Sequence, residues 1–547
     1  MNVPPPSSLP PARAGTPSPP PAATADGTPP VATGTQAPDG TGPAPAGTLP
    51  VATGTPLPTG TPPSPTDNSP VPLPAAAPLT PAVPGPPAPA SPAEPATATG
   101  RARRRDLAAG LGAVLFFLAL AGLGGLLQRD HQVLQSPFPP LEAWWRPHTG
   151  PGTPFAITVA VLAVAYGPAL AARLPWRAVP WAAWAAAMAW TWSLALVDGW
   201  QRGIAGQLTA NGEYLTQLNR FDPLGPALRT YTDHILINSP EHWTTHIAGH
   251  PAGAVLTFVV LDRIGLGGGV AASVFVLTTA TSTAAAVLVA LWLLAGEERA
   301  RAAAPFAALA PGAVWVGVSG DGYFAAVAAW GLALLALAAT RTSRAATAAA
   351  GLAAGVLLGW ACYLSYGLTL LAVPAAVVLL CARSARPLPY ALAGVAAVAA
   401  AFTAAGFDWL QAYGLLHTRY YQGVGGRRPY SYWIFGDLAT VVAAAGPAAM
   451  AGLRRSTAAL PAGVRALRTG RDRAATAAVL LPYGFLLAML AADLSGMSKA
   501  ETERIWLPFT LWLPAAAAFL PRRDARWWLA AQVAAGLFLN HLLHTVW

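Results

Sequence analysis

Charged residues are scarce in this sequence. Only 10% of the 547 residues are Asp, Glu, Lys or Arg, whereas 54% are hydrophobic. Soluble globular domains average about 25% charged residues, so this chain cannot cover a water-facing surface of its size. The scarcity excludes a soluble globular fold for most of the chain and indicates an integral membrane protein.

Cysteine and lysine are nearly absent. Cys362 and Cys381 lie within apolar runs without metal-ligand spacing, so we expect packed core thiols. Lys499 is the only lysine, and the formal charge of +10 comes from arginine clusters between apolar runs. That placement is typical of membrane orientation signals and argues against a nucleic-acid partner.

Residues 1–100 contain no aromatic residue and almost no charge. They repeat short Pro/Gly/Thr phrases, such as VATGT at 31–35 and at 51–55. Such a segment buries too little to offset its ordering entropy, so we expect a disordered arm that acts as a tether or docking segment. It has no basic start followed by an apolar stretch, which argues against a signal peptide.

Residues 101–547 are predicted to form an all-α, polytopic transmembrane bundle of about 13 spans. The basic cluster at 101–105 precedes the first apolar run, so the arm should be cytoplasmic. A short run at 251–266 is interpreted as a half-helix that stays outside, because most loop arginines then fall inside. This places the carboxyl terminus outside a bacterial cytoplasmic membrane. The expected spans are 107–127, 154–173, 178–197, 269–295, 303–319, 322–340, 346–364, 365–382, 389–406, 436–453, 474–493, 505–520 and 527–546.

The largest predicted outer loop, 198–250, begins with Asp198 at the end of a span. A carboxylate at a membrane boundary is a functional candidate, although it can also be a cap or an interface anchor. His242, His246 and His250 recur every four residues, which on a helix would stack them on one face and allow metal binding. No carboxylate completes a familiar ligand set, so structural or substrate-contacting histidines are favoured.

Two further predicted outer loops carry cations that break the positive-inside pattern. Segment 407–435 is rich in Tyr and Trp and contains Arg427, Arg428 and Tyr430, while 493–509 contains Lys499 and Arg504. Arginine forks and a lysine charge match phosphate oxygens, and aromatic rings suit sugar faces. The alternative is an aromatic belt with snorkelling arginines.

A shorter outer turn places Asp321 between glycines, where Asp and Gly also serve simply as turn formers.

The expected outer face therefore combines carboxylates, histidines, cations and aromatics above an apolar bundle. This suits a substrate with a lipid tail, a phosphate and a polar head. A secondary transporter or a flippase is the alternative, but a transporter would favour paired halves and charges near the bilayer midplane. We find no internal repeat of the apolar runs.

Residues 180–340 resemble the GT-C membrane glycosyltransferases. The resemblance rests on Asp198 ending an early span, on His250-Pro-Ala-Gly253 opening a helix, and on Asp321 in the next outer turn. The stretch 296–305 also resembles their pattern, and 498–509 resembles a segment of uncharacterised bacterial membrane proteins near this superfamily. The resemblance implies sugar transfer from a polyprenyl-phosphate donor to a glycan, lipid or protein acceptor, usually with inversion.

The resemblance also implies residue roles. Asp198, or second Asp233, would be the general base. Two extra spans precede the loop, and Gly-Trp follows Asp198 where the family commonly has a second acid. Both departures leave Glu213, Asp222 and Asp233 as competitors. Asp321 and a histidine would orient the sugar or a divalent cation. The expected substrate-binding residues are His234, His246, His250, Arg427, Arg428, Tyr430, Lys499, Glu501, Glu503 and Arg504.

Overall fold

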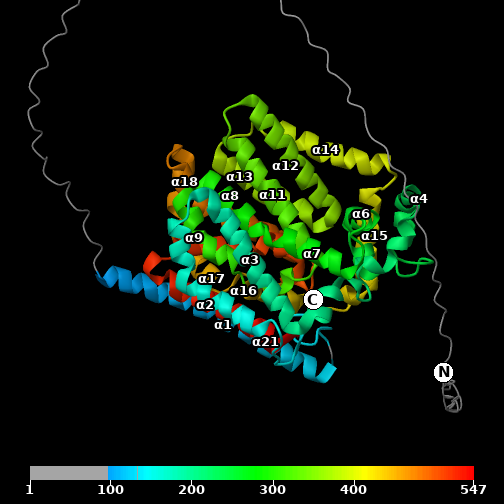
Figure 1. Cartoon of the computed structure of the whole chain (residues 1–547), viewed down its shortest axis with the longest axis horizontal. Helices are drawn as coiled ribbons and strands as arrows, with labels where there is room; N and C mark the ends of the chain where they lie inside the picture. Colours follow the sequence, from blue (N-terminus) through cyan, green and yellow to red (C-terminus); the bar gives the residue numbers. More distant parts are fainter. Residues whose placement is uncertain (1–95, 132, 547) are drawn as a thin grey trace, which may run out of the picture. The chain divides into compact units, whose positions relative to one another are not determined.

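The computed structural model describes residues 96–131 and 133–546, and this part of the chain is nearly all helical (Figure 1). The expected disordered arm therefore lies outside the described residues, apart from 96–100, which begin α1. One small antiparallel sheet pairs β1 (Ala143–Trp145) with β2 (Leu543–Thr545). The sheet ties the connection after α1 to the carboxyl-terminal end of the described chain.

Six helices or helix pairs in the described residues are long and apolar enough to cross a membrane. Each presents a run of at least 18 residues with few charges, which is close to the length that spans a hydrocarbon core. They are α1 (Ala96–His131), α2 (Thr153–Arg173), α7 with α8 (Gly268–Thr281 and Thr283–Ala295), α11 (Gly320–Thr340), α12 (Arg344–Leu364) and α18 (Arg473–Leu494). The chain is therefore a membrane protein with several spans.

Two bent pairs raise the number of candidate spans in the described chain to eight. Helices α14 (Leu388–Ala404) and α15 (Trp409–Gln422) meet at 79°, and α16 (Tyr430–Ala445) and α17 (Pro447–Thr469) meet at 105°. The second bend lies at Gly446, whose φ of 84° suits glycine, followed by a proline without an N–H donor. The thirteen expected spans are not confirmed.

The other expected spans form shorter or interrupted helices. The run 303–319 breaks at Pro311-Gly312, and 505–520 divides at prolines into short turns. Their bounds are α3 (Val179–Ala195), α9 (Glu297–Ala308), α10 (Ala313–Val316), α13 (Ala372–Ala382), α19 (Thr502–Ile505), α20 (Leu507–Thr510) and α21 (Ala525–Leu542). Helix α6 (Ala252–Arg263), at the expected half-helix, has 12 residues and measures about 18 Å, too short for a bilayer core of about 30 Å.

Helix α11 lies in the centre of the bundle: 78% of its most apolar stretch of 18 residues is buried inside the protein. The buried share of the corresponding stretch of α1 is 11%. Helices α12 and α14 pack closely through small residues: a Cβ on Gly355 would lie 2.0 Å from the Ala391 carbonyl oxygen. Figure 1 shows α12 and α14 on the side of the helical part opposite α1 and α21. The exposed leucines of α1 are therefore available to lipid.

The segment 198–250 folds into short turns on this bundle. It includes a 3₁₀ turn at η5 (Tyr214–Phe221), helix α4 (Leu224–Arg229), a turn at η6 (Tyr231–His234) and helix α5 (Thr245–Gly249). Its aromatic side chains join the buried core of the bundle: the Phe221 and Trp243 rings stack with centroids 5.2 Å apart, and the Tyr231 ring centroid lies 5.4 Å from that of Trp243. The Tyr231 hydroxyl donates to the carbonyl oxygens of Ile247 and His250 and so holds the end of α5, while the His250 ring lies 5.6 Å from the Phe324 ring of α11.

Candidate functional site

Two adjoining cavities of about 370 and 800 Å³ open where α5, α15 and the segment 495–504 meet. They share the lining residues Thr245, Gly249, Leu416, Tyr420, Arg428 and Glu501, so we treat them as one polar cavity. His246, His250, Lys499 and Arg504 line the smaller part. The sizes fall in the range of small-molecule binding sites.

The segment 499–501 has an unusual backbone. Ala500 and Glu501 have φ values of 68° and 62°, a left-handed conformation that costs a residue other than glycine about 1–3 kcal/mol. The surrounding structure holds it in place: the Ala500 N–H donates to Asp437 Oδ1 at 3.1 Å, and the Lys499 N–H donates to the Tyr420 hydroxyl at 2.9 Å. Strain of this kind is common at binding and catalytic sites.

Glu501 lies between two buried arginines. Its Oε2 atom is 3.1 Å from Arg504 Nη2, and its Oε1 atom is 3.3 Å from Arg428 Nη1. Burial alone would raise the pKa of Glu501, but Arg504 and Arg428 outweigh it and hold the pKa below its usual value. Glu501 therefore remains charged and connects the two cations.

Each arginine has a second carboxylate. Arg504 forms a buried ion pair with Asp321, in the first turn of α11, where Ser319 caps the helix. Arg428 Nη2 lies 3.1 Å from Glu142 Oε2, in the connection between α1 and α2. Because charges buried without partners are costly, these pairs hold four distant segments of the chain together.

Lys499 is a buried cation in the lining of the cavity. Among the described residues, no carboxylate forms a salt bridge with it; instead its Nζ lies 5.2 Å from the Tyr421 ring and 5.7 Å from the Tyr420 ring. Burial lowers the pKa of the ammonium and Arg428 lowers it further, while Asp437 offsets part of this decrease. An anion entering the cavity would relieve this unfavourable environment.

A buried Glu–His pair lies beside these cations. Glu213 Oε1 is 3.4 Å from His246 Nε2. Burial raises the pKa of Glu213 to about 7, and burial lowers the pKa of His246. His246 lines the cavity and Glu213 lies next to it. A carboxyl group with a pKa near neutral pH that contacts an imidazole in the lining is suited to general acid–base chemistry.

His250 packs beside this pair. Its ring stacks with His246 at a centroid distance of 6.2 Å, and its Nδ1 lies 2.8 Å from the His246 carbonyl oxygen. Because a carbonyl only accepts, Nδ1 carries the proton and Nε2 is left as an acceptor. His242 is exposed and precedes α5, so the three histidines do not share one helix face.

The structure does not bring every expected residue to the cavity. Asp198 Oδ1 lies 3.2 Å from His148 Nε2, 3.6 Å from Arg202 Nε and 3.5 Å from His544 Nε2. None of these residues lines the cavity. This cluster instead fixes the connection before α2 to β2.

The remaining expected residues do not line the cavity. Asp233 and Arg427 are exposed, and the Tyr430 hydroxyl donates to the Leu494 carbonyl at 3.4 Å. His234 Nδ1 bonds the Pro240 carbonyl oxygen at 3.0 Å. Glu503 is buried and accepts a hydrogen bond from the Glu142 N–H at 2.8 Å.

Two residues of the site were not identified from the sequence. Glu142 pairs with Arg428, and burial raises its pKa to about 7; Tyr420 contacts Lys499. Both residues lie in segments that the sequence places on the outer side, and this placement was the one feature of the sequence that pointed to them.

Within residues 96–131 and 133–546, no three His, Cys, Asp or Glu side chains are placed to hold a metal ion.

No protein-family model matches the chain, and the search of curated proteins also gave no match. The geometry of the cavity is therefore the basis for assigning a function.

Proposed function

We propose that the chain is a membrane transferase that moves a sugar from a polyprenyl-phosphate donor to an acceptor hydroxyl. The observation that carries this proposal is the cavity, in which buried cations lie beside His246, whose partner Glu213 has its pKa raised to about 7 by burial. Sugar transfer from a lipid phosphate requires both an anion-binding group and a group that takes a proton. The acceptor would be a glycan, lipid or protein.

In the proposed reaction, the acceptor oxygen attacks the sugar carbon that is bonded to the phosphate. The acceptor proton moves to the Glu213–His246 pair as the new carbon–oxygen bond forms. The old bond between the sugar carbon and the phosphate oxygen breaks, and the lipid phosphate leaves with the electron pair. Lys499 and Arg428 stabilise the negative charge that develops on this phosphate. Arg504 positions Glu501 and Asp321.

The topology is part of the proposal: thirteen crossings, with the amino terminus cytoplasmic and the cavity on the outer face of a bacterial cytoplasmic membrane. We expect a cysteine at exposed Ala210 to react with an impermeant maleimide in intact cells, after Cys362 and Cys381 are replaced. A cysteine at exposed Arg465 should react only after the cells are permeabilised. The reverse labelling pattern would reject this orientation.

The function is tested with purified protein in detergent and a polyprenyl-phosphate donor carrying a radiolabelled sugar. We expect release or transfer of the sugar without any ion gradient, because the proposed chemistry needs only the donor and a hydroxyl. Lys499→Ala should weaken donor binding and slow the reaction, whereas the exposed Arg522→Ala should not. An inactive protein with intact fold would contradict the proposal.

A secondary transporter remains the second candidate because of two observations. Helices α16 and α17 are broken by a 105° bend, and α16 and α18 carry the buried carboxylates Asp437 and Asp493. Broken helices and intramembrane carboxylates are typical of transporters. Uptake of a solute into vesicles that requires a proton or sodium gradient, without sugar transfer in detergent, would support this function instead.

A further inference from the structure

Arginines gather where helix α17 ends and α18 begins. Gly470 closes α17 with a φ of 72°, and α18 starts three residues later at Arg473. Arg465, Arg468 and Arg471 are all exposed in this region. Because α18 is long and apolar enough to cross a membrane, these arginines lie within a few residues of the point where a candidate span begins.

The neighbouring turn 383–387, between α13 and α14, is fastened to this region. Arg383 Nη2 donates to the carbonyl oxygens of Ala466 and Arg471, at 2.9 and 3.0 Å. Arg386 follows in the same turn and is exposed. The two turns therefore form one surface, which we call the basic face and define by its four exposed arginines, Arg386, Arg465, Arg468 and Arg471.

The packing of α17 decides which way its arginines point. Gly463 faces α18, because a Cβ on it would lie 3.1 Å from Val479 Cγ1. At about 100° per residue, Arg465 and Arg468 lie about 200° and 140° around the helix from this glycine. Both arginines are therefore on the side of α17 that faces away from α18, and their spacing of three makes them neighbours on one helix face.

The charges of the basic face are not compensated by carboxylates. None of the salt bridges within residues 96–131 and 133–546 includes any of the four arginines. Asp472 is the one acidic residue of the turn, and its Oδ1 accepts a hydrogen bond from the Ala475 N–H at 2.9 Å, which caps α18. Because like charges repel, a bound anion would stabilise this face.

We propose that the basic face binds the headgroup of an anionic phospholipid. The location selects this anion, because both turns adjoin the ends of apolar helices, α13 and α18, and headgroups lie where apolar spans end. Guanidinium groups also match phosphate oxygens through paired N–H donors. A headgroup that contacts both turns would hold them together and stabilise the bundle. This inference goes beyond sugar transfer and does not depend on it.

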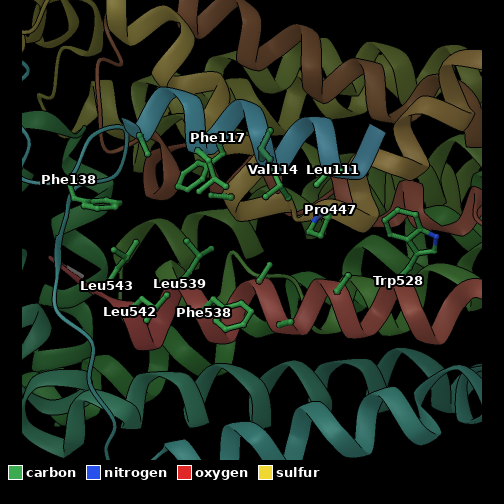
Figure 2. A pocket seen from close by; sticks show the side chains of 18 of the residues that line it. Leu111, Val114, Phe117, Phe138, Pro447, Trp528, Phe538, Leu539, Leu542 and Leu543 are labelled. Atoms are coloured by element: carbon green, nitrogen blue, oxygen red, sulfur yellow. The ribbon is translucent and has the colours of Figure 1, made fainter. Parts of the chain in front are cut away.

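The apolar groove between α1 and α21 provides a comparison. Leu111, Val114 and Phe117 of α1 face Phe538 and Leu539 of α21 across it (Figure 2). None of the residues that line this groove is charged. The groove therefore has no group that selects a headgroup by its charge, and a substitution there should not alter a preference for anionic lipid.

The test heats the purified full-length protein in neutral detergent with phosphatidylglycerol or with phosphatidylcholine of the same acyl chains. Size-exclusion chromatography then measures the fraction that stays folded. Phosphatidylglycerol should raise the apparent melting temperature, whereas phosphatidylcholine should not. In the double variant Arg465→Gln with Arg468→Gln, the phosphatidylglycerol concentration for half of this effect should rise about tenfold or more, because each basic residue near an anionic surface strengthens binding by about fivefold.

Arg386→Gln alone tests the second turn and should raise the same concentration by about fivefold. A matched control removes two exposed arginine charges elsewhere, Arg229→Gln with Arg263→Gln, and leaves the basic face intact. It should change the concentration less than about twofold, as should Ala535→Trp in the groove.

Three results would overturn the inference. The first is equal stabilisation by phosphatidylcholine, and the second is an unchanged phosphatidylglycerol requirement in the Arg465→Gln, Arg468→Gln variant. The third is stabilisation by a soluble anion in place of lipid: inorganic phosphate would indicate a site for free phosphate, and polyglutamate would indicate an acidic protein partner. Raising the sodium chloride concentration to about 1 M should weaken the effect of phosphatidylglycerol, because salt screens charges at an exposed surface.

Discussion

Replacing Glu213 with Gln is expected to lower turnover by a factor of about 10² to 10⁴, the usual contribution of a general base. The change keeps the shape beside His246, 3.4 Å away, but removes the group that accepts the proton. Because this interaction matters in the transition state, kcat should fall while donor binding changes little. Steady-state kinetics with the labelled donor and a direct binding measurement would separate the two effects.

The pH profile of the same enzyme provides a second readout. Burial raises the pKa of Glu213 to about 7, and a base must be unprotonated to act. In the wild type, kcat should therefore rise as the pH increases through about 7, and Glu213→Gln should lose this rise. His246→Gln should cost nearly as much as Glu213→Gln, and the double variant little more, because the two residues act as a unit.

The comparison variant is Asp198→Asn, the base first favoured from the sequence. Asp198 binds His148, Arg202 and His544, none of which lines the cavity, whereas the partner of Glu213 does, so loss of Asp198 should affect turnover much less. Glu298→Gln, at an exposed carboxylate, controls for charge alone. An inactive Asp198→Asn enzyme together with an active Glu213→Gln enzyme would restore Asp198 as the base.

Removing the Arg504 charge is expected to destabilise the fold by about 3–5 kcal/mol, the typical cost of leaving a buried charge without its partner. In Arg504→Met, the carboxylates of Asp321 and Glu501 would lose their shared cation, and Asp321 is only 2% exposed. The apparent melting temperature in detergent, followed by size-exclusion chromatography after heating, should fall markedly. Arg504→Lys should recover part of the loss, because lysine keeps the charge but not the planar fork.

A double-mutant cycle tests whether the pair is the cause. Asp321→Asn combined with Arg504→Met should destabilise less than the sum of the single changes, because the buried charge is then removed with its partner. Arg522→Met breaks the exposed pair with Glu298 and should have almost no effect. An unchanged melting temperature in Arg504→Met would show that the pair does not support the fold.

The class of fold follows from local properties of the sequence. A shortage of charge and long apolar runs require a membrane environment, and an apolar run needs a helix because no water satisfies its backbone there. Helices α1, α2, α11, α12 and α18 accordingly lie close to the expected spans. The sequence was less informative at 303–319 and 505–520, where glycine and proline interrupt apolar runs that composition alone describes as continuous.

In the candidate site too, the sequence predicts some features and the tertiary structure decides the others. Cations and histidines in the loops expected on the outer side marked the segments of the candidate site, and Arg428, Lys499, Glu501, Arg504, His246 and His250 all line one cavity. Which carboxylate belongs with them was decided by tertiary structure. Asp198 and Glu213 look alike in sequence, but packing buries Glu213 beside His246 and joins Asp198 to β2. The sequence by itself therefore determined the membrane environment, the helical class of fold and the kinds of side chain present, because these depend on composition and local pattern. Only the folded chain determined the partners and the pKa values, because these depend on burial and on charges hundreds of residues apart.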